Sequence, residues 1–153
     1  GYKDLVGEIL KKSETYDCKI YYPLDVVVSK TLNGSGIIKE INEVNNDEMI
    51  LDIGPKTITS IKNIINESNT VLWNGPAGYF ENPNFANGTK KILEIIADKR
   101  VKDKIYAVAG GGETVAVINK FNKLETFNFV STAGGAFLEY LEGKELPGIK
   151  VLN

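Results

Sequence analysis

The strongest constraint on the fold is a unit that recurs after residue 48: a short apolar run, a turn containing glycine, and then a helical pattern of apolar residues. The apolar runs lie at 49–53, 71–73, 105–109 and 127–130. Strands that alternate with helices at this spacing predict βα units and a mostly parallel sheet. Because such crossovers are right-handed, all of the glycine turns are expected at the carboxyl edge of that sheet, where open α/β sheets bind ligands. The predicted fold class is therefore α/β, a Rossmann-like parallel sheet with flanking helices.

The region before residue 49 follows a different pattern. Residues 2–16 predict an amphipathic helix, and residues 18–29 predict a β segment that Pro23 interrupts. The polar stretch 31–48 contains one short strand signal around its isoleucines. No low-complexity linker divides the 153 residues, so a single domain is expected.

Composition excludes several classes of function. Eighteen Lys and Arg residues against twenty Asp and Glu residues give a net charge of −2, which predicts neither a nucleic acid nor a membrane surface as partner. The absence of histidine removes Ser-His-Asp and Cys-His catalysis and any histidine general base. The single cysteine, Cys18, excludes a disulfide framework, and we interpret it as a packed thiol in a cytoplasmic protein. The longest apolar runs fall far below the roughly 18 residues that a membrane helix needs.

The glycine turns at 110–114 and 131–135 have the chemistry of phosphate sites. The start of a helix presents unpaired N–H groups and a partial positive charge, and glycine lets a ligand approach the backbone closely. The alternative is that these glycines only permit tight turns. Named nucleotide motifs fit poorly, because GxxxxGK[ST] is absent and Val115 stands where a dinucleotide fingerprint has Gly or Ala. A dinucleotide oxidoreductase is therefore disfavoured.

Three polar side chains near the turns each allow two interpretations. Glu113 holds Mg²⁺ or complements the helix dipole. Thr114 bonds a phosphate oxygen or caps the helix. Glu81 accepts hydrogen bonds from ribose hydroxyls or is simply solvated. Trp73, at the end of a strand, is predicted to lie in the core.

An ordered set of motifs carries a resemblance to a known family. The motifs are LDIGPKT (51–57), LWNGPAGYFE (72–81), Phe85 with Gly88-Thr89, AGGGET (109–114) and VSTAGGAFLEYLEGKELPGI (130–149); less specifically, IYYPLDVVV (20–28) precedes them. Over nearly the whole chain this set resembles the carboxy-terminal part of the phosphoglycerate kinases.

That resemblance implies a glycolytic transferase, cytoplasmic and normally monomeric. The family moves a phosphoryl group reversibly between 1,3-bisphosphoglycerate and MgADP, giving 3-phosphoglycerate and ATP. Its carboxy-terminal domain holds the nucleotide and its amino-terminal domain holds the glycerate. Residues 1–153 are then expected to be part of the nucleotide-binding domain, without the substrate domain and the lysine-bearing first part of the nucleotide domain. We expect such a piece to be inactive alone. Phosphoryl transfer needs positioning and charge stabilisation, so the lack of histidine is no obstacle.

The resemblance also implies roles for individual residues. Gly134 and Gly135 would steady the transferring phosphoryl group, and Glu113 would hold Mg²⁺. The implied nucleotide-binding residues are Gly54, Asn74, Gly75, Pro76, Gly78, Glu81, Gly111, Gly112, Glu113 and Thr114. Two residues depart from the family pattern: Glu113 stands where an Asp is usual, and Ala133 replaces the first glycine of a triple. The Cβ of Ala133 fits only if that residue has a negative φ.

Two other readings of the chain remain open at this point. One is a non-catalytic nucleotide-binding α/β module, which would bind ATP or ADP without turnover. The other is a folding fragment that binds nothing until the rest of its domain is supplied.

Overall fold

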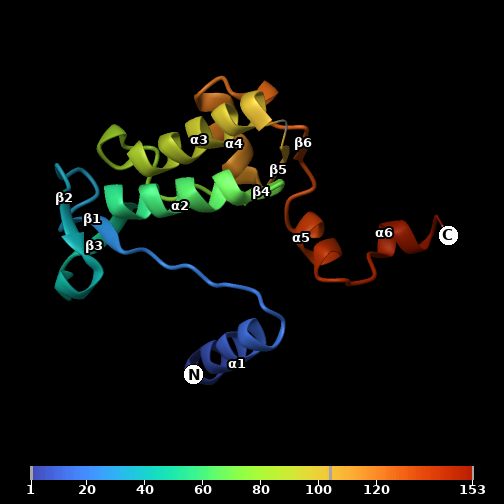
Figure 1. The fold of residues 1–153 in the computed structure, drawn as a ribbon, viewed down its shortest axis with the longest axis horizontal. Coiled ribbons are helices and arrows are strands. Elements are labelled where there is room, and N and C mark those ends of the chain that lie inside the picture. Colours follow the sequence, from blue (N-terminus) through green and yellow to red (C-terminus); the bar gives the residue numbers. More distant parts are fainter. Residues whose placement is uncertain (1, 104, 153) are drawn as a thin grey trace.

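A computed structural model describes residues 2–103 and 105–152 of the chain (Figure 1). Short 3₁₀ turns lie at Ile41–Glu43, Pro83–Phe85 and Leu124–Thr126. The helices and strands, in chain order, are α1 (Tyr2–Thr15), β1 (Asp25–Ser29), β2 (Ile37–Glu40), β3 (Met49–Ile53), α2 (Pro55–Glu67), β4 (Thr70–Asn74), α3 (Asn87–Asp103), β5 (Tyr106–Gly110), α4 (Gly112–Lys120), β6 (Phe129–Ser131), α5 (Gly135–Leu141) and α6 (Pro147–Lys150).

The parallel sheet confirms the predicted α/β class. Its strands lie in the order β4-β5-β6, and α3 and α4 connect them as crossovers. Side chains alternate between the two faces, because successive residues of a strand point in opposite directions. Trp73 and Ala107 are buried on the helix-covered face, whereas Leu72 and Tyr106 are about half exposed. The helices therefore cover one face of this sheet more fully than the other.

The hydrophobic core fills the space between the parallel sheet and its helices. Leu93 and Ile96 of α3 and Ile118 of α4 are almost fully buried there. The rings of Trp73 and Phe127 stack with their centroids 5.9 Å apart. The prediction that Trp73 is a core residue is confirmed. Aromatic pairs of this kind contribute about 0.5–1.5 kcal/mol beyond the area that they bury.

The strand at 49–53 does not join the parallel sheet, so that part of the prediction is wrong. It forms β3 of a second, antiparallel sheet with strand order β2-β1-β3. The central strand β1 places Val26 opposite Ile53 and Val27 opposite Ile38. Like the parallel strands β4 and β5, β3 is followed by a glycine turn and a helix. It differs from those strands in its partner, because it pairs with β1, which is distant in sequence.

The two ends of the chain extend from this body. Figure 1 shows α1 standing apart at the end of an extended segment, and α5 and α6 leading away on another side. The helix predicted at 2–16 is confirmed as α1, but none of its residues is buried. The predicted β segment at 18–29 is a strand only from Asp25 onward. Cys18 is exposed, so its interpretation as a packed thiol is wrong. Within the described ranges, no helix combines the length and the apolar character needed to cross a membrane.

Candidate functional site

Three glycine turns meet at the carboxyl edge of the parallel sheet. Asn74, at the end of β4, pairs with Gly110, at the end of β5, and Gly110 pairs with Ser131, at the end of β6. The segments that follow these residues begin the loop toward α3, the helix α4 and the loop toward α5. The predicted clustering of glycine turns is therefore confirmed for three of the turns. The fourth turn, after β3, belongs to the other sheet.

The turn after β5 presents helix-start N–H groups. Gly111 precedes α4 with a φ of 94°, a conformation that L side chains rarely adopt. A Cβ on Gly111 would also lie 2.6 Å from Oδ1 of Asn74. The next three residues, Gly112 to Thr114, form the first turn of α4, so their N–H groups have no partner within the helix. A Cβ on Gly112 would meet no atom within 4 Å, which means that the fold itself does not require a glycine there.

Thr114 connects this turn to the neighbouring one. Its side chain is fully buried, and its hydroxyl oxygen accepts a hydrogen bond from the N–H of Gly75. The side chain thus holds the loop after β4 against the start of α4. The hydroxyl of Thr114 thus has a role that neither interpretation foresaw, which is to position the loop after β4. The backbone N–H of Thr114 remains one of the unpaired N–H groups at the start of α4.

The loop after β4 contacts α4 near both ends of that helix. At the far end of α4, the Nζ of Lys120 donates to the carbonyl oxygen of Phe80 over 2.7 Å and lies 5.3 Å from the centre of the Phe80 ring. Glu81 follows immediately and is exposed. Phe80, which precedes Glu81, is therefore bonded to the end of α4 opposite the turn at 111–113, and this nine-residue helix is about 13 Å long.

Glu113 is the acidic residue of the first turn of α4 and is exposed. It forms no ion pair with any residue that the structure describes. Across the described part of the chain, no group of three or more His, Cys, Asp or Glu side chains is placed to hold a metal ion. A single carboxylate suits Mg²⁺ that is bound mainly by phosphate oxygens and water, because Mg²⁺ in nucleotide sites commonly uses one or two carboxylates. The residues present fit such an ion and do not fit a metal site built from protein ligands alone.

The turn after β6 has free space around its two glycines, Gly134 and Gly135. Gly134 has a φ of 57°, and α5 begins at Gly135. A Cβ on either glycine would meet no atom within 4 Å. Ala133, in contrast, is not among the non-glycine residues with positive φ, so its Cβ is tolerated without strain. Its N–H donates to the hydroxyl of Ser131, which tightens the turn.

Two of the glycines assigned to the nucleotide, Gly54 and Gly78, also have a structural explanation. Gly54 follows β3 and directly precedes α2, and a Cβ there would lie 2.3 Å from the carboxyl carbon of Asp25. The structure therefore does not bring Gly54 to the glycine edge. Gly78 lies in the loop after β4, where a Cβ would come within 2.5 Å of Oδ1 of Asp52. Asn74, Gly75 and Pro76 begin that loop at the edge itself.

Sequence reasoning missed Asp25, a buried carboxylate that fixes α2. Its oxygens accept hydrogen bonds from the N–H of Lys56, the N–H of Thr57 and the Thr57 hydroxyl, over 2.8–3.0 Å. Burial alone would raise the pKa of Asp25, but these hydrogen bonds and the charge of Lys56 outweigh it and lower the pKa below its ordinary value. In the sequence, Asp25 is only an aspartate next to an apolar run of valines. Nothing near it indicates that its partners lie at the start of α2, more than thirty residues later.

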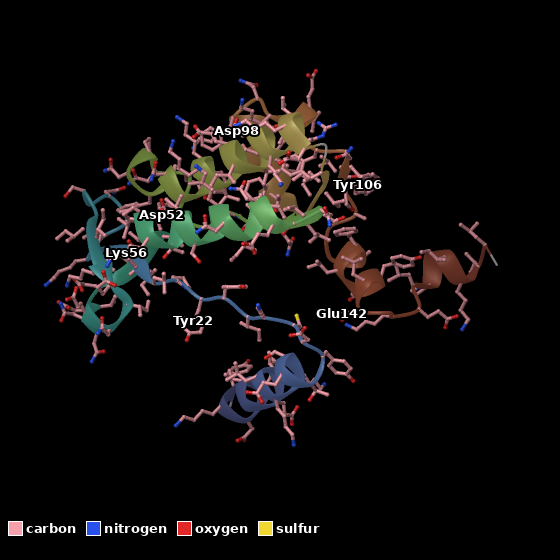
Figure 2. All side chains as sticks on the ribbon, in the orientation of Figure 1. Tyr22, Asp52, Lys56, Asp98, Tyr106 and Glu142 are labelled. Atoms are coloured by element: carbon pink, nitrogen blue, oxygen red, sulfur yellow. The ribbon has the colours of Figure 1, made fainter. Side chains whose placement is uncertain are left out.

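Asp52 of β3 plays the corresponding part for α3, and Figure 2 labels it near the ends at which α2 and α3 begin. Its Oδ2 accepts from the N–H of Gly88 over 2.8 Å, and its Oδ1 accepts from the N–H of Ile53. The side chain is 1% exposed. Burial raises the pKa of Asp52, and the hydrogen bonds from Gly88, Ile53 and Asn87 only partly offset that effect.

These features define a class: an α/β protein in which glycine-rich strand-to-helix turns gather at one edge of a parallel sheet. The family model for phosphoglycerate kinase matches residues 2–144 of the chain. The chain therefore belongs to the phosphoglycerate kinase family.

Individual relatives agree with the family match. Over 99% of its length, the chain is 47% identical to a phosphoglycerate kinase of Francisella philomiragia and 45% identical to one of Zymomonas mobilis. It spans only 39% and 38% of those two proteins. A solved structure of phosphoglycerate kinase from Coxiella burnetii superimposes with a TM-score of 0.88 at 37% identity, and one from Pyrococcus horikoshii with 0.81 at 31%. The chain covers 39% and 36% of those structures.

Proposed function

We propose that this chain supplies part of the nucleotide site of a phosphoglycerate kinase, which transfers a phosphoryl group reversibly between 1,3-bisphosphoglycerate and MgADP to give 3-phosphoglycerate and ATP. The observation that carries the proposal is the turn at 111–113. Its first-turn N–H groups lack helix partners, and Gly112 has open space where a Cβ would stand. Family membership supplies the reaction, and the open helix start supplies a place for a phosphate.

The geometry suggests how a nucleotide would lie. Phosphates would be held by the N–H groups of Gly111 to Thr114, and Glu81 would accept hydrogen bonds from the ribose hydroxyls. These two contacts lie at opposite ends of α4, so they suit an elongated ligand that carries hydroxyls at one end and phosphates at the other. Asn74 and Pro76 would line the nucleoside between them. Gly134 and Gly135 would steady the transferring phosphoryl group, and Glu113 would hold Mg²⁺, which neutralises phosphate charge when bound.

The same proposal covers the domain to which these residues belong, the place of the second substrate and the cellular setting. Residues 1–153 would belong to the carboxy-terminal, nucleotide-binding domain, and 3-phosphoglycerate would bind to a part of the family fold that these residues do not form. The setting would be glycolysis in the cytoplasm, with a monomeric enzyme. Because the chain spans about two fifths of its relatives, we expect it to bind nucleotide without turnover by itself.

A calorimetric titration of MgADP into the chain tests the nucleotide site. We expect binding in the unmodified chain and an affinity loss of about tenfold to hundredfold in Glu81→Ala, because a hydrogen bond to a charged group contributes about 1.5–3 kcal/mol. Glu67→Ala is the matched control, since Glu67 is an exposed glutamate at the end of α2. Equal affinities in all three proteins would contradict the assignment of Glu81. No binding to any of them would contradict a nucleotide site formed by this chain.

The charge of Glu113 is expected to matter only when Mg²⁺ is present. Glu113→Gln keeps the shape of the side chain and removes its charge. We expect it to weaken MgADP binding by about tenfold, the effect of one charge-assisted contact, and to leave metal-free ADP binding unchanged. Titrations with and without Mg²⁺ measure the difference, and Glu113→Asp, which restores the residue usual in the family, should bind like the unmodified chain. An equal loss with and without the metal would mean that Glu113 does not act through Mg²⁺.

A further inference from the structure

We propose that Thr89 is a positioning residue: its hydroxyl fixes the conformation of the loop 75–81 and thereby the place of Glu81. Thr89 follows Gly88 in the first turn of α3 and is fully buried. The proposal has two parts. The first, that Thr89 fixes the loop, stands independently of the proposed function. The second, that the loop in turn affects nucleotide binding through Glu81, rests on the proposed function.

The chain of contacts starts at β3. Asp52 is fixed by the antiparallel sheet, where it pairs with Val27 of β1. Its Oδ2 accepts a hydrogen bond from the N–H of Gly88, so the carboxylate holds the start of α3. A side chain at position 88 would prevent this contact, because a Cβ there would lie 2.3 Å from Oδ1 of Asp52 and 2.5 Å from a side-chain carbon of Ile53. The glycine thus permits the close approach of α3 to β3.

The close packing of α3 against β3 places the side chain of Thr89 next to the loop 75–81. Its hydroxyl oxygen accepts two hydrogen bonds, from the N–H of Ala77 over 3.0 Å and from the N–H of Gly78 over 3.3 Å. Both donors belong to a loop without regular structure, whose backbone N–H groups have no ladder to pair with. One side chain therefore satisfies two successive donors of the loop.

The loop is held on either side of this contact by other elements. Thr114 accepts from Gly75, Leu51 of β3 accepts from the N–H of Tyr79, and Lys120 donates to Phe80. Among the described residues, the hydrogen bonds that Ala77 and Gly78 donate in the middle of the loop go to Thr89, and the side chain of Ala77 also packs against the core. Without the Thr89 contact, the N–H groups of Ala77 and Gly78 would lose their acceptor, and the path of the loop from Gly75 toward Glu81 would be less constrained.

Amide hydrogen exchange followed by NMR measures the structural part of the proposal. In the unmodified chain, the amides of Ala77 and Gly78 should exchange at least about tenfold more slowly than those of Gly112 and Glu113, which have no helix partner. Thr89→Val has nearly the same shape and no acceptor. It should accelerate exchange at Ala77 and Gly78 by about tenfold and leave Ala107, in the middle of the sheet, unchanged.

The same proteins are then titrated with MgADP. Thr89→Val is expected to weaken binding by about tenfold, and Thr89→Ser, which keeps the hydroxyl, should restore both the affinity and the slow exchange. Thr59→Val is the matched control, because Thr59 is exposed and its hydroxyl donates to the carbonyl oxygen of Pro55 in its own helix.

Each outcome decides the question. Exchange at Ala77 and Gly78 that is as fast as at Gly112 in the unmodified chain would overturn the proposal even if Thr89→Val did not fold. If Thr89→Val accelerated exchange at Ala107 as well as in the loop, Thr89 would stabilise the whole fold and not the loop specifically, which would contradict the proposal. Faster exchange in the loop with unchanged MgADP affinity would refute its effect on Glu81. If the unmodified chain bound no MgADP, the proposed function would fail, while the exchange rates would still decide whether Thr89 holds the loop.

Discussion

Replacing Gly112 with alanine is expected to remove most MgADP binding while leaving the chain as stable as before or slightly more so. A Cβ at this position meets no atom of the protein within 4 Å, and alanine is favoured over glycine in a helix by about 0.5–1 kcal/mol. A phosphate held by the N–H groups of the first turn of α4 would, however, lie against that Cβ. Inserting a methyl group into a filled contact costs about 1–3 kcal/mol, which corresponds to a loss of affinity of about fivefold to 150-fold.

The matched control for this variant is Gly7→Ala. Gly7 lies within α1, and a Cβ there also meets no atom within 4 Å. Both variants should raise the midpoint of thermal unfolding by at most a few degrees, since about 1 kcal/mol shifts a chain of this size by about 2–4 °C. Only Gly112→Ala should lose MgADP in calorimetry. Unchanged affinity in Gly112→Ala would show that no phosphate approaches this turn, and equal losses in both variants would indicate an indirect effect.

The parallel sheet and its glycine edge could be predicted because their signals are local. Each apolar run, glycine turn and apolar helix face lies within about twenty residues, and right-handed crossovers then place the turns together. The turns after β4, β5 and β6 met these expectations. The helical patterns expected after the first three apolar runs are also present, as α2, α3 and α4.

The antiparallel sheet could not be predicted in the same way. Strand β3 has the same local pattern as the parallel strands, and it differs only in its partner, β1, which lies more than twenty residues earlier. The expected position of Gly54 changed with that of β3, because a glycine before a helix looks the same in sequence whether it admits a ligand or a neighbouring carboxylate. In the structure, that neighbour is Asp25.

The threonines Thr89 and Thr114 show a second limit of sequence reasoning. Each stands in the first turn of a helix, where a hydroxyl ordinarily caps its own helix or faces a ligand. Both instead accept hydrogen bonds from the loop 75–81, whose donors lie 11 and 12 residues before Thr89 and 39 residues before Thr114. Their burial, and not their residue type, indicates this role, and burial depends on how the loop 75–81 folds back between α3, α4 and β3.

The largest loss of stability is expected from Asp25→Ala. The substitution removes the acceptor for the N–H groups of Lys56 and Thr57 and for the Thr57 hydroxyl, all of which are at the start of α2. Hydrogen bonds to a charged group contribute about 1.5–3 kcal/mol each, and lost helix caps cost about 0.5–2 kcal/mol, so we expect a net loss of about 3 kcal/mol at pH 7. Urea unfolding measures it. Asp98→Ala is the control, since Asp98 is exposed on α3 (Figure 2) and should change the free energy of unfolding by less than about 0.5 kcal/mol.

The effect of Asp25→Ala should also depend on pH in a defined direction. The pKa of Asp25 is lowered in the folded chain, so its charged form stabilises the fold above the unfolded pKa of about 3.9, and this contribution disappears as the pH falls through the folded pKa. Asp52 acts in the opposite direction, because its raised pKa makes the fold less stable as the pH rises through that value. Since Asp52 is present in both proteins, the difference in unfolding free energy between the unmodified chain and Asp25→Ala isolates Asp25. That difference should be constant from pH 5 to 7 and should shrink below about pH 4. A difference that grew on acidification would mean that Asp25 is held protonated in the fold and that α2 is anchored by a neutral carboxyl group.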